Sequence, residues 1–303
     1  MRLAFFGTSA FAVPALLSLA DHVDLVVTQP RRPSGRGNKL LPTPVGEAAA
    51  QLGIDTLSPE KAKEESFVEV IEARAFDAMV VASYGQILSG RLLAASKRGG
   101  INLHASLLPQ YRGAAPINHA ILAGDTESGV TLMQMDRGMD TGDIIAQETI
   151  PIGTDETVGD LEMRLATLAA EMAAAWMPKI VSGDYSRVPQ DHALATIAPK
   201  IKIADMLISF DESAETAYLR YRAFTPKPGA RVTASGGRIK ILRCRLGSEV
   251  GDPGTLLERH DSGIEVAFAT GSLILESLQP DNKGPVSGND YANGRRLVKG
   301  DRL

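Results

Sequence analysis

The sequence predicts an α/β protein with a Rossmann-like, mainly parallel sheet and a second, smaller β-rich domain. Residues 1–150 alternate short apolar runs with helical patterns, which is typical of βαβ units. Short β-like runs separated by glycine-rich turns follow after about residue 205, and their spacing favours a small barrel or sandwich. The length of 303 residues is sufficient for about two domains.

The expected strands of the first domain are unbroken apolar runs, which suit strands buried on both faces of a sheet. They lie at residues 3–6, 23–28, 78–82, 101–104 and 130–135. Residues 143–150 follow a glycine-containing turn, so we expect them to pair back on the preceding strand as a hairpin. Helical patterns lie at residues 43–52, 59–73 and 157–181.

The boundary between the domains is expected where the periodic pattern dissolves. Two prolines and few large apolar side chains lie between residues 183 and 202, which is typical of a linker. The predicted domains are therefore residues 1–183 and 206–303, joined by a linker over residues 184–205. In the second domain we expect a helix at residues 213–223 and strands at residues 231–234, 239–246, 263–269 and 272–278.

Composition excludes several classes of protein. The single cysteine, Cys244, excludes an intramolecular disulfide framework and a cluster of thiolate metal ligands. The scattered histidines match no metal-ligand spacing, and no window offers eighteen uninterrupted apolar residues for a membrane span. Gly7 and Pro14 interrupt the apolar N-terminus, which favours a strand, a turn and a helix over an export signal. We therefore expect a cytoplasmic protein without a metal.

Two polar residues at the end of an expected strand are candidates for catalysis. Asn102 and His104 lie two positions apart, so their side chains point to the same face. They precede a loop at the C-terminal end of the strand, where open α/β sheets place their ligands. An asparagine amide can stabilise an oxyanion, and a neutral histidine can accept a proton. Taken alone, the pair is more typical of residues that cap backbone groups.

A polar turn supplies a third candidate. Asp136, Asp140 and Asp143 lie within eight residues in a glycine-containing turn between two expected strands. One of these carboxylates could orient a histidine, as the third member of a catalytic triad does. Aspartate and glycine are also good turn formers, so spacing alone does not separate the two interpretations.

Longer motifs decide between these interpretations. They are Phe6-Gly7-Thr8-Ser9, Thr28-Gln29-Pro30, Asn102-Leu103-His104, Ser106-Leu107-Leu108-Pro109, Arg112-Gly113-Ala114-Ala115-Pro116 and Met139-Asp140-Thr141-Gly142-Asp143. Together they resemble the methionyl-tRNA formyltransferases, within the wider group of enzymes that use 10-formyltetrahydrofolate. The resemblance is dense to about residue 150 and thinner beyond it.

The resemblance implies a formyltransferase fold with an OB-like C-terminal barrel, and formyl transfer from 10-formyltetrahydrofolate to the amine of initiator methionyl-tRNA. The residues that match the family's catalytic ones are Asn102, His104 and Asp140, and those that match its folate-binding segment are Ser106, Leu107, Leu108 and Pro109. The chemistry needs no metal, and we expect a monomer that contacts no membrane. The alternatives are transfer to a sugar-nucleotide amine, and a tRNA-binding protein without catalysis.

Two basic runs without acidic residues favour a polyanionic partner. One spans residues 29–39 and contains Arg36 and Lys39. The other spans residues 220–245 and contains Arg222, Lys227, Arg238 and Lys240. By similarity, Arg36 matches an arginine that reaches the acceptor end of the tRNA. Each run taken alone is more typical of a solvated charged surface, and it is the occurrence of both that favours the polyanion.

Four positions depart from the pattern of the family. Arg31 stands where an aspartate is common, and Ser209 begins a pair that replaces Asp-Trp. The stretch around Ile197 lacks the usual tyrosine and glutamate, and Lys227 lies in a segment that lacks a common tryptophan. All four lie outside the expected catalytic residues, so they bear on linker packing and tRNA contacts.

Overall fold

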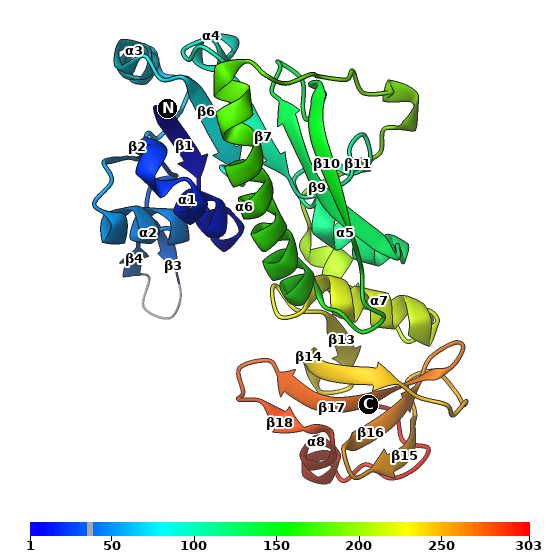
Figure 1. The fold of residues 1–303 in the computed structure, drawn as a ribbon. Helices are drawn as coiled ribbons and strands as arrows, with labels where there is room; N and C mark the ends of the chain where they lie inside the picture. The colour runs from blue at the N-terminus through cyan, green and yellow to red at the C-terminus, as the bar shows by residue number, and fades with distance from the viewer. Residues whose placement is uncertain (35–38) are drawn as a thin grey trace. The chain divides into compact units, whose positions relative to one another are not determined.

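The computed structural model describes residues 1–34 and 39–303 and divides the chain into two compact units (Figure 1). Unit 1 comprises residues 1–116, 127–151 and 162–199, and unit 2 comprises residues 117–126, 152–161 and 200–303. The chain therefore passes from one unit to the other five times. No helix among the described residues is long and apolar enough to cross a membrane.

Unit 1 is built around a mainly parallel sheet with the strand order β10-β9-β7-β6-β1-β2-β5 (Figure 1). Its parallel strands are β1 (Leu3–Gly7), β2 (Val23–Val27), β5 (Thr56–Leu57), β6 (Ala78–Ala82) and β7 (Gly100–His104). The hairpin predicted from the sequence is confirmed as the antiparallel pair β9 (Glu127–Gln134) and β10 (Ile144–Pro151). Because the strand order reverses at β1, β6 and β7 lie on one side of it and β2 and β5 on the other.

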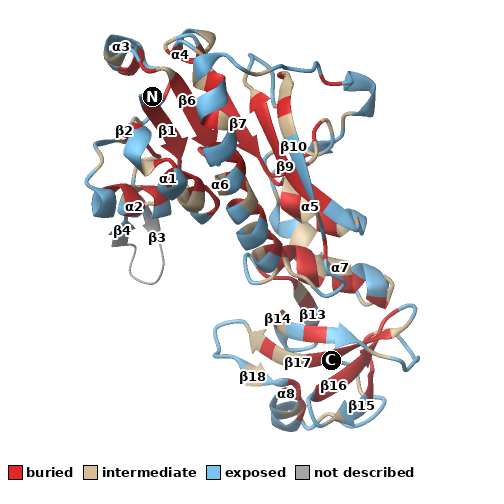
Figure 2. Cartoon of the chain, in the orientation of Figure 1, coloured by how far each residue is buried: buried red, intermediate tan, exposed pale blue. Residues whose placement is uncertain are grey.

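The central strands are buried along their whole length, as unbroken apolar runs predict (Figure 2). On one face, Phe6 of β1 and Met79 of β6 pack in a cluster with Phe67 of α3 (Glu65–Arg74) and Leu92 of α4 (Gly90–Leu93). The other helices of unit 1 are α1 (Val13–Ser18), α2 (Pro44–Leu52) and most of α6 (Val158–Ser182), whereas α5 (Pro116–Ala123) lies almost wholly in unit 2.

The ends of the helices follow local capping chemistry. At the start of α2, the hydroxyl of Thr43 accepts the N–H of Gly46 at 3.0 Å, and Pro44 occupies the first turn. Gly53, with φ 70°, ends the helix in a left-handed conformation. The helix predicted over residues 59–73 begins only at Glu65, because Gln86 holds the preceding backbone outside a helix. Its Oε1 accepts the N–H of Ala62 at 2.7 Å.

The segment expected to be a linker contributes ordered structure to unit 1 over most of its length. Val188 forms a bridge to Ile144 at the start of β10, and β11 (Ile197–Ala198) pairs in parallel with β8 (Arg112–Gly113). Residues 184–199 are therefore part of this unit, and residues from 200 onward belong to unit 2.

Unit 2 contains a separate sheet with the strand order β12-β13-β14-β17-β16-β15, and a short strand, β18, pairs with β17. The strands are β12 (Leu207–Ile208), β13 (Arg231–Ala234), β14 (Gly237–Leu246), β15 (Leu256–His260), β16 (Gly263–Ala267), β17 (Ser272–Pro280) and β18 (Val286–Ser287). Phe224 at the end of α7 (Ala214–Phe224) joins Ile241 and Cys244 in its core, with α8 (Gly288–Arg295) packed nearby. Cys244 is thus a packing residue, and burial raises the pKa of its thiol.

Candidate functional site

β7 ends with the two polar side chains that the sequence singles out. Asn102 and His104 have exposed fractions of 9% and 6%, and their spacing on the strand directs both to one face. Their strand is held on both sides, by β6 in parallel and by β9 in antiparallel pairing. The backbone beneath the two residues is therefore fixed by sheet hydrogen bonds.

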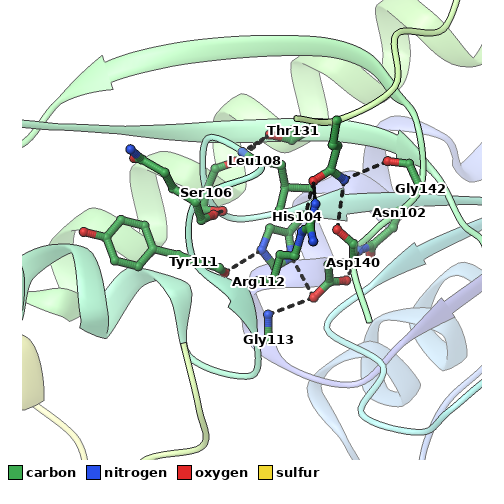
Figure 3. A network of polar contacts seen from close by, with 12 residues as sticks. Asn102, His104, Ser106, Leu108, Tyr111, Arg112, Gly113, Thr131, Asp140 and Gly142 are labelled. Atoms are coloured by element: carbon green, nitrogen blue, oxygen red, sulfur yellow. Dashed lines mark hydrogen bonds and ion pairs between the residues drawn. The ribbon is translucent and has the colours of Figure 1, made fainter. Parts of the chain in front are cut away.

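Asp140, in the loop between β9 and β10, reaches both of these side chains (Figure 3). Its Oδ2 accepts the N–H of Gly113 at 2.9 Å and lies 3.8 Å from Nδ1 of His104. Its Oδ1 accepts Nδ2–H of Asn102 at 3.5 Å. The structure thus gathers the three residues expected to be catalytic around one carboxylate.

The local backbone explains why this loop has its sequence. Asp140 has φ 55°, a left-handed conformation that aspartate tolerates better than most residues with a side chain. A Cβ atom at Gly142 would collide with the carbonyl oxygen of Gln134, so only glycine fits there. The other two carboxylates of the turn do not join the site: Asp136 accepts the hydroxyl of Thr141 at 2.7 Å, and Asp143 faces Arg187 at 4.0 Å.

The hydrogen-bond partner of His104 determines which ring nitrogen carries its proton. Nε2 lies 3.0 Å from the carbonyl oxygen of Tyr111. A carbonyl oxygen can only accept, so Nε2 donates and the neutral ring leaves Nδ1 unprotonated. Since Nδ1 is the nitrogen on the side of Asp140, a proton taken up there creates an imidazolium beside a carboxylate.

The segment expected to bind folate follows directly after β7 and is held by one hydroxyl. Oγ1 of Thr131 donates to the carbonyl of Ser106 at 2.6 Å and accepts the N–H of Leu108 at 3.0 Å. Gln147 donates to the carbonyl of Leu108 at 2.7 Å. Ser106 and Leu108 are buried, whereas Leu107 and Pro109 are half-buried and keep apolar surface accessible.

Gln190 and its partner Arg112 escaped the sequence analysis as functional candidates. Gln190 is only 5% exposed, and its Nε2 donates to the carbonyl oxygens of Asp140 at 2.9 Å and Gly142 at 2.7 Å. Its Oε1 accepts from Nε and Nη2 of Arg112, at 3.1 and 2.6 Å. No local pattern marks Gln190, because it lies in the weakly patterned segment expected to be a linker, 50 residues from Asp140.

Comparison with known proteins places the whole chain in one family. The model of the formyl transferase family matches residues 1–177, and that of the formyl transferase C-terminal domain matches residues 200–296. Methionyl-tRNA formyltransferase from Geobacter metallireducens is 41% identical over 100% of this chain and 98% of its own length. The chain belongs to the methionyl-tRNA formyltransferase family. The enzyme of that name from Moorella thermoacetica is likewise 41% identical, over 100% of this chain and 99% of its own.

Solved structures share the fold of this family at lower identity. An N-formyltransferase from Helicobacter canadensis, in complex with folinic acid and dTDP-3-aminofucose, has a TM-score of 0.66 at 20% identity, over 91% of this chain and 99% of its own. HypX from Aquifex aeolicus, in complex with tetrahydrofolic acid, has a TM-score of 0.68 at 15% identity, over 100% of this chain and 49% of its own. At these identities the likeness concerns the fold alone.

The basic residues expected to bind tRNA fall into different environments. Arg36 lies outside the described residues, and Lys39 begins β4 (Lys39–Leu41), which pairs with β3 (Arg32–Ser34). Arg222, expected to bind tRNA, does not lie on an exposed surface of unit 2. It is 7% exposed, and its guanidinium donates to the carbonyl oxygens of Glu156 at 2.9 Å and Gly153 at 2.8 Å.

The remaining basic run of unit 2 carries less free charge than its sequence suggests. Arg231 and Arg238 share Asp281, and Arg243 and Arg245 share Glu276. These acids come from β17 and the turn after it, so a run that is acid-free in sequence is partly neutralised in space.

Two lysines of this run differ in their accessibility. Lys227, at one of the positions that depart from the family pattern, is exposed. Lys240 is half-buried and donates to the carbonyl oxygen of Pro226 at 3.0 Å. Burial, together with the positive charges of Arg231 and Lys227, lowers the pKa of Lys240.

Throughout residues 1–34 and 39–303, no group of three or more His, Cys, Asp or Glu side chains could hold a metal ion.

Proposed function

We propose that this chain transfers the formyl group of 10-formyltetrahydrofolate to the amino group of methionine on initiator tRNA. The observation that carries the proposal is the meeting of Asn102, His104 and Asp140 at the end of β7. The amide, the imidazole and the carboxylate supply an oxyanion donor, a base and a group that stabilises the protonated base. Relatives that are 41% identical over the whole chain bear the name of this activity.

The residues that would hold the folate are Ser106, Leu107, Leu108 and Pro109. The hydrogen bonds from Thr131 and Gln147 satisfy the backbone of this segment and make it rigid. Its accessible apolar side chains suit an aromatic ring system, so the segment fits the proposed donor. The bound donor supplies an activated formyl group on a nitrogen that can leave.

The chemistry assigned to the protein is a proton transfer and the stabilisation of one negative charge. The neutral amine forms a bond to the formyl carbon while Nδ1 of His104 takes up its proton. An N–H of Asn102 stabilises the negative charge that develops on the formyl oxygen. His104 returns the proton to the departing nitrogen as its bond to the formyl carbon breaks. Asp140 orients His104 and stabilises the imidazolium.

The tRNA is assigned to Arg36 and Lys39 and, in unit 2, to the exposed Lys227 and Arg238 and the half-buried Lys240. The proposal assigns catalysis to residues 1–183 and tRNA binding to residues 206–303. Residues 184–205 join the two along the chain, and residues 184–199 of this stretch fold with unit 1. The proposal also includes closure of the unit 2 sheet into an OB-like barrel. The mainly antiparallel strands of that sheet support this part of the proposal. We also propose that the protein is a monomer. We place it in the cytoplasm because initiator tRNA is used where translation takes place.

The deciding experiment measures formyl transfer from 10-formyltetrahydrofolate to three acceptors: charged initiator tRNA, charged elongator tRNA and a sugar-nucleotide amine. Transfer confined to the initiator supports the proposed function. Transfer to the sugar alone would leave the catalytic assignment standing and overturn the acceptor. Folate-independent tRNA binding without transfer would point to a non-catalytic relative.

Substituting Arg36 by alanine is expected to raise KM for initiator tRNA by about tenfold or more, the scale of one charged hydrogen bond. Folate affinity should change less than twofold, which can be measured by titration without tRNA. Arg31→Ala in the same basic run is the matched control and should cost much less. Equal losses of folate and tRNA affinity in Arg36→Ala would contradict the assignment.

A further inference from the structure

We infer that Gln190 is a positioning residue for Asp140, an inference that rests on the proposed function and deepens it. The four hydrogen bonds of its amide link Arg112 on one side to the backbone on both sides of Thr141 on the other. Arginine can only donate and a carbonyl can only accept, so a single orientation of the amide satisfies all four bonds. Gln190 therefore connects Arg112 rigidly to the Asp140 loop. Rotating its amide by 180° would exchange the oxygen and the nitrogen and break these hydrogen bonds.

The loop that Gln190 holds needs such support. Asp140 is the member of the catalytic set that a loop supplies, whereas Asn102 and His104 come from a central strand. Its left-handed backbone is a conformation that persists in proteins when the surroundings impose it. With Nε2 of Gln190 donating to the carbonyl oxygens of Asp140 and Gly142, the surroundings impose it here.

Residues 190–198, the segment that begins with Gln190, also hold the two backbone groups that bind the side chains of Asp140 and His104. β11 pairs with β8, which carries the Gly113 N–H that binds Oδ2 of Asp140. The hydroxyl of Thr196 accepts the N–H of Tyr111, whose carbonyl accepts Nε2–H of His104. Residues 190–198 thus fix Asp140 through its backbone and its carboxylate, and His104 through its proton.

Arg112 fixes the oxygen side of the Gln190 amide. It is 6% exposed, and Nη2 donates to Nδ1 of His192 at 3.0 Å as well as to Gln190. The guanidinium holds the amide of Gln190 by its oxygen and leaves the N–H groups to the Asp140 loop. The two halves of the amide can therefore be tested separately, because glutamate retains the half that faces Arg112.

The test uses the full-length enzyme with the variants Gln190→Met and Gln190→Glu. Methionine removes all four hydrogen bonds, whereas glutamate keeps the contact with Arg112 and loses both donors to the loop. We expect both variants to lower kcat by about 10- to 100-fold, the effect of a small displacement of a catalytic group. KM for the folate and for the tRNA should stay within about twofold of wild type, because Gln190 is only 5% exposed and its amide is occupied by Arg112 and the Asp140 loop.

Gln134→Met is the matched control, since it removes the same kind of contact elsewhere in unit 1. Nε2 of Gln134 donates to the carbonyl oxygens of Arg98, just before β7, and of Gly100, its first residue, both at 3.1 Å. Its kcat should stay within about twofold of wild type. If Gln190→Glu keeps the wild-type kcat, or if Gln134→Met loses as much as Gln190→Met, the inference is overturned.

A double-mutant cycle with Asp140→Asn separates positioning from a general effect on the fold. If Gln190 acts through Asp140, adding Gln190→Met to Asp140→Asn should lower single-turnover transfer by less than about twofold. Multiplying effects would overturn the inference. Wild-type enzyme that formylates no initiator methionyl-tRNA would refute the proposed function; an active wild type with an equally fast Gln190→Met would refute only the role of Gln190.

Discussion

Replacing Asn102 or His104 by alanine is expected to lower kcat for formyl transfer by about 10²-fold or more, the scale of an oxyanion donor or a general base. Asn102→Ala removes the N–H assigned to the formyl oxygen. His104→Ala removes the nitrogen that faces Asp140 at 3.8 Å and with it the proton acceptor. Single-turnover transfer to charged initiator tRNA measures the effect directly.

Binding of tRNA should be nearly unchanged in both variants, because neither side chain is assigned to the tRNA. Ser96→Ala is a suitable control: Ser96 is a buried residue whose hydroxyl donates to the carbonyl of Gly99 at 3.0 Å, just before β7. It should retain kcat despite the loss of a buried hydrogen bond. A large loss of tRNA affinity in Asn102→Ala or His104→Ala would count against their catalytic roles.

Replacing Glu265 by leucine is expected to destabilise unit 2 by about 3–5 kcal/mol, the cost of breaking a buried charged network. Glu265 is 1% exposed, and its Oε1 accepts the N–H groups of Ser248 and Glu249, both at 2.9 Å. The hydroxyl of Ser272 donates to the same oxygen, and Nε2 of His260 lies 2.6 Å from Oε2. Leucine leaves the buried hydroxyl of Ser272 and the three partly buried donors without their acceptor. Urea unfolding of the full-length protein at neutral pH measures the loss.

The pH dependence of this effect gives a second and independent check. Burial raises the pKa of Glu265, but the hydrogen bonds from Ser272, Glu249, His260 and Ser248 together outweigh it and lower the pKa below its usual 4.5. A carboxylate with a lowered pKa stabilises the fold above the pKa of the unfolded chain, and the contribution is lost as the pH falls through the folded value. The difference between wild type and Glu265→Gln should therefore shrink below about pH 4.5. A difference that grows on acidification would contradict this account.

Periodicity predicted those elements whose burial is simple. The strands of unit 1 are buried on both faces, so β1, β6 and β7 appear in the sequence as uninterrupted apolar runs. β15 and α8 were missed because exposed polar positions interrupt the first and dominate the second. The same limit applies to charge: the acids that pair with the basic run of β14 lie more than thirty residues further along the chain.

The site was predictable to the extent that its residues share a motif. Asn102, His104 and Asp140 stand in stretches with a recognisable pattern, and the structure brings them together. The partners that hold them are set by contacts between distant segments, such as the 78 residues between Arg112 and Gln190. Backbone groups such as the Tyr111 carbonyl and the Gly113 N–H leave no trace in residue identity at all.

The repeated passage of the chain between the units has a consequence for synthesis. Residues 117–126 and 152–161 leave the ribosome well before residues 200–303, with which they form unit 2. Their contacts arise late: Asn118 donates to the carbonyl of Ala223, and Asp155 accepts the hydroxyl of Tyr218. A nascent chain that stops near residue 200 already contains residues 117–126 and 152–161, but the part of unit 2 against which they fold has not yet been synthesised. A gene fragment that starts near residue 200 lacks both segments and therefore encodes an incomplete unit 2.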